Sequence, residues 1–179
     1  MAEQRRCATA EEAARGDIPE RYARALATAT SPDRTAAVVL LETNEPPSVE
    51  IYEVVCVKRA GGWVDFGGGG GFGIGWTSTA RDPERNLGVV KLSGQAPSGA
   101  VAVVVAFGGR EHRVDVSGDG YFVFASWDEP DTALENDAPE PVRYVLADGS
   151  SVPAPEGDRH GATFRRLSER MRARHWDSG

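Results

Sequence analysis

The most regular hydrophobic pattern of the chain lies between residues 101 and 124. Seven apolar residues at 101–107, four of them valine, end at a pair of glycines, and polar and apolar residues then alternate. A Gly-Asp-Gly turn at 118–120 leads into the apolar residues 121–124. Short β-branched and aromatic runs between glycine turns are typical of β-strands, so this stretch predicts a three-strand antiparallel meander. The run at 101–107 should be covered on both faces, because an exposed strand of this kind promotes aggregation.

The same reasoning predicts strands on either side of this stretch. Residues 35–41 form an apolar run, and residues 49–57 carry apolar side chains on both faces, so both strands should be largely buried. A tight Ala-Gly-Gly turn at 60–62 joins the second strand to residues 63–66. Further strands are predicted at residues 87–92, 142–146 and 151–152. Together they predict an all-β sandwich of seven to nine antiparallel strands.

The two ends of the chain have helical patterns. A short helix is predicted over residues 8–15, and a second helix over residues 17–30 carries a narrow apolar stripe that could dock on a sheet. Residues 162–175 predict an amphipathic helix at the other end. Its apolar face holds Phe164, Leu167, Met171 and His175, and its basic face holds Arg165, Arg166, Arg170, Arg172 and Arg174.

This basic helix has two interpretations. Its apolar face could dock on the domain or on a second copy of the chain, which would leave the arginines in solvent near the acidic residues 128–140. Alternatively, the arginines could contact an anionic partner, which would be a nucleic acid, a membrane surface or an acidic protein. The net charge of −7 makes a protein partner the better fit.

A glycine-rich stretch at residues 67–75 is the most unusual part of the sequence. Phosphate-binding glycine loops open a helix and are followed by a lysine or by helix N–H groups, and neither pattern follows here. A flexible hairpin loop or a bulge is the simplest interpretation, with Phe72, Ile74 and Trp76 holding its far end to the core. A loop that contacts a ligand or a partner is the alternative, because glycine allows close approach of the backbone.

Composition and charge restrict the class of protein. A chain of 179 residues with 40% apolar residues fits one domain, and 21 glycines and 11 prolines suit a β protein with many turns. Only two of the 20 basic residues are lysines, Lys58 and Lys91. No stretch of 18 apolar residues and no signal-like apolar segment occurs in the sequence, so a soluble cytoplasmic protein is expected.

The two cysteines have different surroundings. Cys56 interrupts an apolar run and is interpreted as a buried, inert thiol. Cys7 lies in a polar segment, and a disulfide between the two is the alternative. No spacing of cysteine or histidine matches a metal site, so neither a metal nor a cofactor is expected.

No catalytic motif stands out. His112 lies in a predicted strand between two charged residues, and no serine is flanked by the glycines of a nucleophile elbow. The chain is therefore not expected to be an enzyme. An enzyme or a small-molecule pocket would need an internal cavity with a convergent carboxylate, for which Asp65 and Glu53 are the candidates.

Residues 94–124, with their two valine-rich strands and the Asp-Gly-Tyr-Phe motif at 119–122, resemble small transthyretin-like or carboxypeptidase-regulatory-like sandwich domains. The same sequence pattern, together with a Gly-Gly-Trp hairpin like that at 61–63, resembles actinobacterial proteins of unknown function. This resemblance implies a β-sandwich and no catalytic residues. Helices followed by strands and this hairpin are also similar to the ketosteroid-isomerase-like α+β cone, which would have a curved sheet and a pocket.

We therefore expect three parts: an N-terminal helical segment at 1–33, a β-sandwich domain at 34–153, and a linker with a basic helical tail at 154–179. The expected function is a non-catalytic protein-binding or regulatory module that binds another protein or a second copy. A pocket protein or enzyme of the α+β cone type is the alternative. The candidate contact residues are Trp63, Phe72, Trp76, Arg165, Arg166, Arg170, Arg172 and Arg174.

Overall fold

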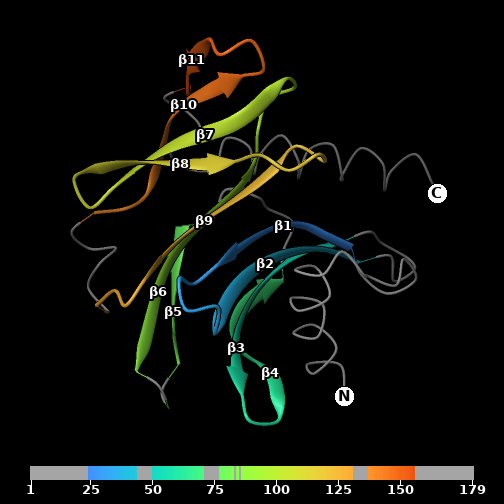
Figure 1. Cartoon of the computed structure of the whole chain (residues 1–179), viewed down its shortest axis with the longest axis vertical. Helices are drawn as coiled ribbons and strands as arrows, with labels where there is room; N and C mark the ends of the chain where they lie inside the picture. The colour runs from blue at the N-terminus through green and yellow to red at the C-terminus, as the bar shows by residue number, and fades with distance from the viewer. Residues whose placement is uncertain are drawn as a thin grey trace, which may run out of the picture.

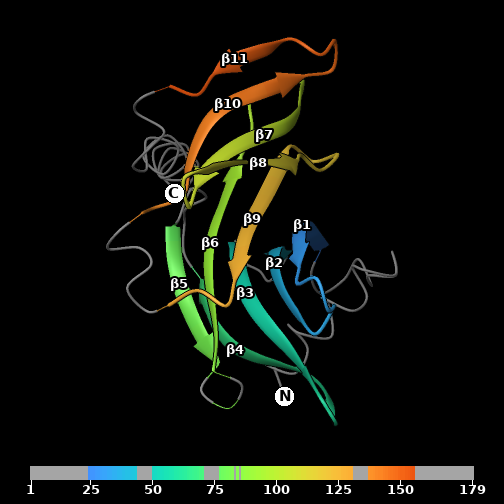
Figure 2. The same ribbon diagram turned by 60° about the vertical axis from the view of Figure 1, so that its left-hand side comes forward.

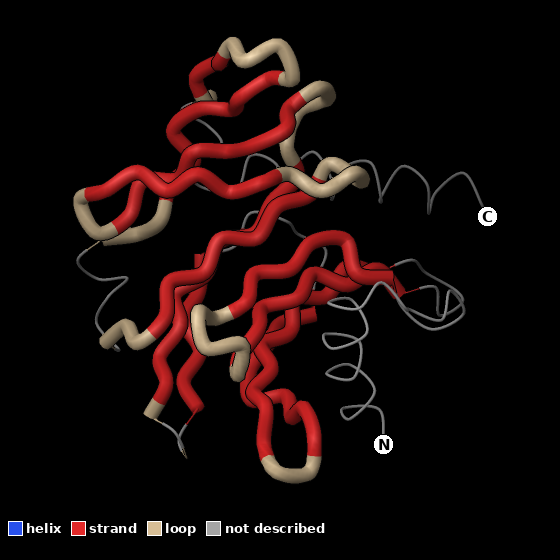
Figure 3. The backbone as a smooth tube through the Cα atoms, viewed as in Figure 1, coloured by secondary structure: helices blue, strands red, loops and turns tan. Residues whose placement is uncertain are grey.

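The computed structural model describes residues 24–43, 50–70, 77–82, 84, 86–130 and 137–155, and most of them are β-strand (Figure 3). The strands are β1 (Arg24–Thr30), β2 (Ala36–Thr43), β3 (Glu50–Arg59), β4 (Gly62–Gly70), β5 (Thr77–Asp82), β6 (Leu87–Gln95), β7 (Ala100–Phe107), β8 (Arg110–Asp115), β9 (Tyr121–Trp127), β10 (Glu140–Leu146) and β11 (Ser151–Pro153). The predicted mostly-β class is confirmed. Within these ranges no helix has the length and hydropathy needed to cross a membrane.

The strands form three antiparallel sheets (Figures 1 and 2). Sheet A has the order β1-β2-β3-β4, sheet B the order β5-β6-β9, and sheet C the order β11-β10-β7-β8. Sheet B is the middle layer, because the side chains of β6 and β9 contribute to two different hydrophobic clusters on its two faces. Sheet A packs on one of these faces and sheet C on the other.

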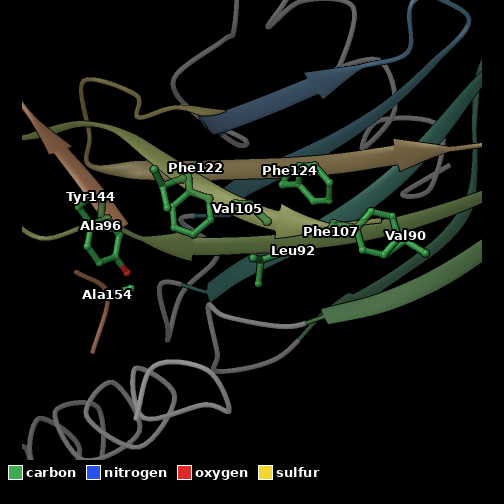
Figure 4. Close-up of a cluster of buried hydrophobic side chains, with 10 residues drawn as sticks. Val90, Leu92, Ala96, Val105, Phe107, Phe122, Phe124, Tyr144 and Ala154 are labelled. Atoms are coloured by element: carbon green, nitrogen blue, oxygen red, sulfur yellow. The ribbon is translucent and has the colours of Figure 1, made fainter. Parts of the chain in front are cut away.

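The cluster between sheets B and C, here called the B/C core, contains aromatic side chains from both layers (Figure 4). Val90 and Leu92 of β6 face this core together with Phe122 and Phe124 of β9. The rings of Phe107 and Phe124 meet edge to face with their centroids 5.8 Å apart. Alternate residues of β6 and β9 therefore point into the B/C core, and the residues between them face sheet A.

Sheets A and B enclose the second cluster, here called the A/B interior. Its buried members are Leu26, Val38, Leu40, Val55, Val89 and Val123. The two sheets also touch along both edges, because β1 lies beside β9 and β4 lies beside β5. The A/B interior is therefore enclosed by the two sheets and by the strand contacts at both of their edges, which explains why its central side chains are almost fully buried.

The predicted three-strand meander is wrong in one pairing. β7 pairs with β8 as expected, but β9 pairs with β6 in sheet B. β9 is apolar on both faces, so it is best buried between two layers. β8 instead alternates exposed and half-buried residues, which suits the edge of a sheet.

The predicted helix over residues 17–30 is wrong at its C-terminal end, because Arg24–Thr30 is strand β1. Leu26 of this strand is 2% exposed in the A/B interior, and β1 pairs with β2 from Arg24 to Thr30. Tertiary pairing thus overrides the helical spacing of its apolar residues. The sheet consequently begins at residue 24, where the sequence predicted a domain start at residue 34. The predicted helices at 8–15 and 162–175 lie outside the described residues.

Two further predictions change in detail. The first four glycines of the glycine-rich stretch are paired residues of β4, opposite Tyr52 to Val55 of β3, so this part is strand and not loop. Cys56 is fully buried as predicted, but it is disulfide-bonded, so the interpretation as a free thiol is wrong. The predicted turns at 60–62 and 118–120 are confirmed, each with a glycine at positive φ.

Candidate functional site

Polar side chains occur inside the otherwise apolar A/B interior. On β3 the inward-facing row contains Ile51, Glu53 and Val55, and on β6 it contains Val89 and Lys91. The alternation of the strands places these two charged residues there, because their sequence neighbours face the opposite sides of sheets A and B. Charged groups are rarely buried in this way unless they are paired.

Lys91 and Glu53 form an ion pair between Lys91 Nζ and Glu53 Oε1 that joins sheet B to sheet A. Lys91 is 3% exposed and Glu53 is 9% exposed. The second carboxylate oxygen, Glu53 Oε2, is buried and has no hydrogen-bond partner in the part of the chain that is described. Burial disfavours the charged ammonium and lowers the pKa of Lys91 to about 8.

Two further ion-pair groups lie at opposite ends of the A/B interior. At one end Arg24 of β1 contacts Glu42 of β2 and Asp119 before β9, with both N–O distances at 2.9 Å. Burial, followed by the negative charges of Glu42 and Asp119, raises the pKa of Tyr121 at this end. These contacts link β1 to the segment that precedes β9. They therefore hold sheet A against sheet B at one of the two edges where the sheets meet.

At the other end Asp82 of β5 is fully buried. Its Oδ1 accepts hydrogen bonds from Arg59 Nη2 at 2.8 Å and from the backbone N–H of Glu84 at 3.1 Å. Arg59 also pairs with the exposed carboxylate of Glu84. Because Arg59 ends β3 and Asp82 ends β5, this group joins sheet A to sheet B at the second edge.

Of the predicted contact residues, Trp63 alone lies within the described ranges. Trp63 is the second residue of β4 and is half-buried against the outer face of sheet A. Its buried indole Nε1 has no hydrogen-bond partner among the described residues. The other predicted contact residues lie outside the described residues: Phe72, Trp76, Arg165, Arg166, Arg170, Arg172 and Arg174.

The two candidate carboxylates, Glu53 and Asp65, lie on opposite faces of sheet A. Glu53 faces the A/B interior, whereas Asp65 pairs with Cys56 and therefore lies toward the opposite face of sheet A. The ring of His112 lies 5.2 Å from the ring of Phe124, and its Nε2 lies 3.2 Å from the carbonyl oxygen of Phe107. His112 is therefore a packing residue at the margin of the B/C core.

Sequence reasoning missed Lys91, although a signal was present. It is one of two lysines in the chain, and it stands within an apolar run of the sequence at residues 89–92. A lysine in such a run requires a buried counter-charge, and Glu53 interrupts the apolar row of the facing sheet in the same way. Chemically, a buried lysine with a pKa near 8 can act as a nucleophile toward a carbonyl group if a substrate reaches it.

No group of three or more metal-ligating side chains occurs within the described ranges. No protein-family model matches the chain, and no curated protein and no solved structure matches it either. The function is therefore argued from the geometry of this chain alone.

Proposed function

We propose that the chain is a non-catalytic protein-binding module that contacts its partner through an apolar corner of sheet C. The observation that carries this proposal is the exposure of two valines there. Val101, at the start of β7, and Val152, in β11, are each 41% exposed. Both strands flank β10, and these three strands meet at the upper end of the molecule in Figure 1.

The pairing places Val152 on the core face of sheet C, and Val101 lies on the other strand that flanks β10. Tyr144 of β10 pairs with Val103 on one side and with Val152 on the other, so these three side chains share a face. Val101 is the extra residue of a bulge in β7, because Val145 pairs with Ala102 and Leu146 pairs with Ala100. Tyr144 and Val103 are buried in the B/C core, so Val152 extends the apolar face of that core, and Val101 is exposed at the bulge near it.

A surface of this kind fits an apolar segment of another protein or of a second copy. Exposed apolar side chains beside a core are what a protein interface buries, whereas a polyanion would need a positive field that a net charge of −7 opposes. The charged groups of the A/B interior pair with one another, which supports a structural and non-catalytic role for them. The proposal includes a relationship to the transthyretin-like sandwich domains that the sequence resembles.

The test uses the full chain with Val101→Ser and Val152→Ser combined, and Val64→Ser as the matched control. Val64 is 40% exposed but lies on β4 of sheet A. Sedimentation over a range of concentrations measures self-association, and affinity capture from the native source measures partner binding. We expect the double variant to lose binding by at least tenfold and the control to keep it. Equal binding by all three proteins would overturn the proposal.

The buried pair supports a second candidate function, a small-molecule pocket protein or enzyme. The specific observation is the lysine with a pKa near 8 beside a carboxylate oxygen that lacks a hydrogen-bond partner. Reductive trapping with a small aldehyde at pH 8, read by mass spectrometry, separates the candidates, because exposed Lys58 serves as the internal control. A binding module predicts modification of Lys58 and protection of Lys91. Preferential modification of Lys91 would favour the pocket.

A further inference from the structure

The outer face of sheet A is apolar and buried, yet no described strand packs on it. Ala37, Val39, Leu41, Val54 and Cys56 are each at most 2% exposed. The half-buried side chains that pack against them also belong to strands of sheet A. Sheet B covers the other face of sheet A, and sheet C lies beyond sheet B. The cover of the outer face must therefore come from residues outside the described ranges.

The disulfide of Cys56 identifies that cover. Cys56 lies within this face, is fully buried and is disulfide-bonded. The sequence has one other cysteine, Cys7. A fully buried Cys56 is not accessible to a second copy of the chain. We propose that Cys7 is its partner, and that residues 1–23 lie across the outer face of sheet A and are fixed there by this disulfide.

The length of the N-terminal segment permits this link. Cys7 and Arg24, the first residue of β1, are 17 positions apart. Cys56 lies on the second strand from β1, which is a distance of about 10 Å, and some five residues farther along the sheet, about 17 Å. The segment must span roughly 20 Å, and 17 residues cover about 25 Å as a helix or about 55 Å when extended.

The chemistry requires an oxidant. The two thiols lose two protons and two electrons as the sulfur–sulfur bond forms, and a small or protein disulfide accepts them and leaves as two thiols. Disulfides persist mainly in oxidising compartments. The proposal therefore predicts that the disulfide persists in an oxidising compartment, whereas the sequence alone led us to expect a cytoplasmic protein.

The first test is a peptide map of the full chain. The protein is equilibrated with glutathione disulfide, its free thiols are blocked, and it is digested without reduction. We expect one linked peptide pair containing Cys7 and Cys56, which separates on reduction. Two blocked thiols, or a dimer linked through Cys56, would overturn the proposal.

A thermal measurement adds an independent readout. Cys7→Ser leaves every residue of the sheet unchanged, and it should lower the Tm by about 10 °C because the unfolded chain is no longer cross-linked. Reductant should lower the Tm of the wild type to the same value and leave that of the variant unchanged. A Tm that responds to neither change would contradict the proposal.

Moving the cysteine tests which face the segment covers. Cys56→Val combined with Val54→Cys keeps the thiol on the outer face, and Cys7 should still form a disulfide. Cys56→Val combined with Val55→Cys places the thiol in the A/B interior, and both thiols should remain free. A linked peptide in the second protein, or none in the first, would show that residues 1–23 do not cover this face.

Discussion

At the scale of single residues, the Lys91–Glu53 pair is the most demanding feature of the molecule. Both charges are taken out of water, and their attraction has to offset the cost of that desolvation. A buried pair of this kind stabilises little compared with apolar residues of similar volume, but losing one partner leaves an uncompensated charge. The pair therefore favours the arrangement of sheets A and B in which Lys91 and Glu53 face each other.

The buried Lys91–Glu53 pair predicts that two substitutions have non-additive effects. Lys91→Met leaves the Glu53 carboxylate buried alone and should lower the free energy of unfolding by about 3–5 kcal/mol. Lys91→Met combined with Glu53→Leu removes both charges and should recover most of that loss. Urea unfolding of the two single variants and the double variant gives the coupling energy. Additive effects would show that the two groups do not interact in the folded protein.

The pKa of Lys91 predicts a pH dependence. Burial lowers this pKa from 10.5 to about 8 in the folded protein, whereas a lysine in the unfolded chain keeps its ordinary value. Between pH 8 and 10.5 the unfolded chain thus binds more protons, and the free energy of unfolding rises with pH. We expect a rise of about 2 kcal/mol from pH 8 to pH 9.5. The raised pKa of Tyr121 acts in the opposite direction only above about pH 10.

The matched control for this pH dependence is the protein with Lys91→Met and Glu53→Leu. Its free energy of unfolding, measured by urea denaturation at the same pH values, should lack the rise. A rise of equal size in both proteins would assign the effect to other groups.

The residue scale also shows where sequence reasoning succeeds. Glu53 could be placed on the same side of its strand as Val55 and Val57, because alternation fixes side-chain direction once a strand is recognised. Its pairing with Lys91 could not be predicted, because the two residues come from strands of different sheets. Alternation gives no information about which sheet lies opposite.

At the scale of elements, apolar runs predicted the strands but not their partners. Residues 121–124 could be recognised as a strand, yet the pairing of β9 with β6 depends on the B/C core that forms on one side of both strands. β1 was missed because Leu26 and its neighbours fit a helical spacing as well as a strand. Its pairing with β2, a contact outside any local window, decides between them.

A close contact at the start of β6 gives a prediction at this scale. The backbone N–H of Glu129 donates to the carbonyl oxygen of Gly88 at 3.2 Å, and a β-carbon on Gly88 would overlap the carbonyl oxygen of Glu129. Gly88→Ala should therefore push the segment after β9 away from β6 and lower the free energy of unfolding by about 1–3 kcal/mol. Thermal and urea unfolding measure this loss.

Gly61→Ala provides the matched control, because a β-carbon at Gly61 would meet no atom within 4 Å. Its free energy of unfolding should stay within about 0.5 kcal/mol of the wild type. Equal effects of the two substitutions would argue against the contact between β6 and Glu129.

At the scale of the whole molecule, the fold depends on the two edges where sheets A and B meet. Arg24 fastens the edge between β1 and β9, and Arg59 with Asp82 fastens the edge between the β3–β4 hairpin and β5. The sequence predicted a helix over Arg24, and the partners of Arg24 and Arg59, Asp119 and Asp82, are 95 and 23 positions away. Only the closed arrangement of the sheets brings them together.

The Arg59–Asp82 contact gives the last prediction. Asp82 is fully buried, and one of its oxygens, Oδ2, has no hydrogen-bond partner in the described part of the chain, so Arg59 is its main counter-charge. Arg59→Met should leave this carboxylate uncompensated and lower the free energy of unfolding by about 3 kcal/mol or more in urea. Arg143→Met is the matched control, because Arg143 makes a two-hydrogen-bond contact with Glu111 that is exposed to solvent. Solvent screens that pair, so its loss should leave urea unfolding almost unchanged. If both substitutions had the same small effect, sheets A and B would be held together by the apolar A/B interior alone, without help from the ion pairs at their edges.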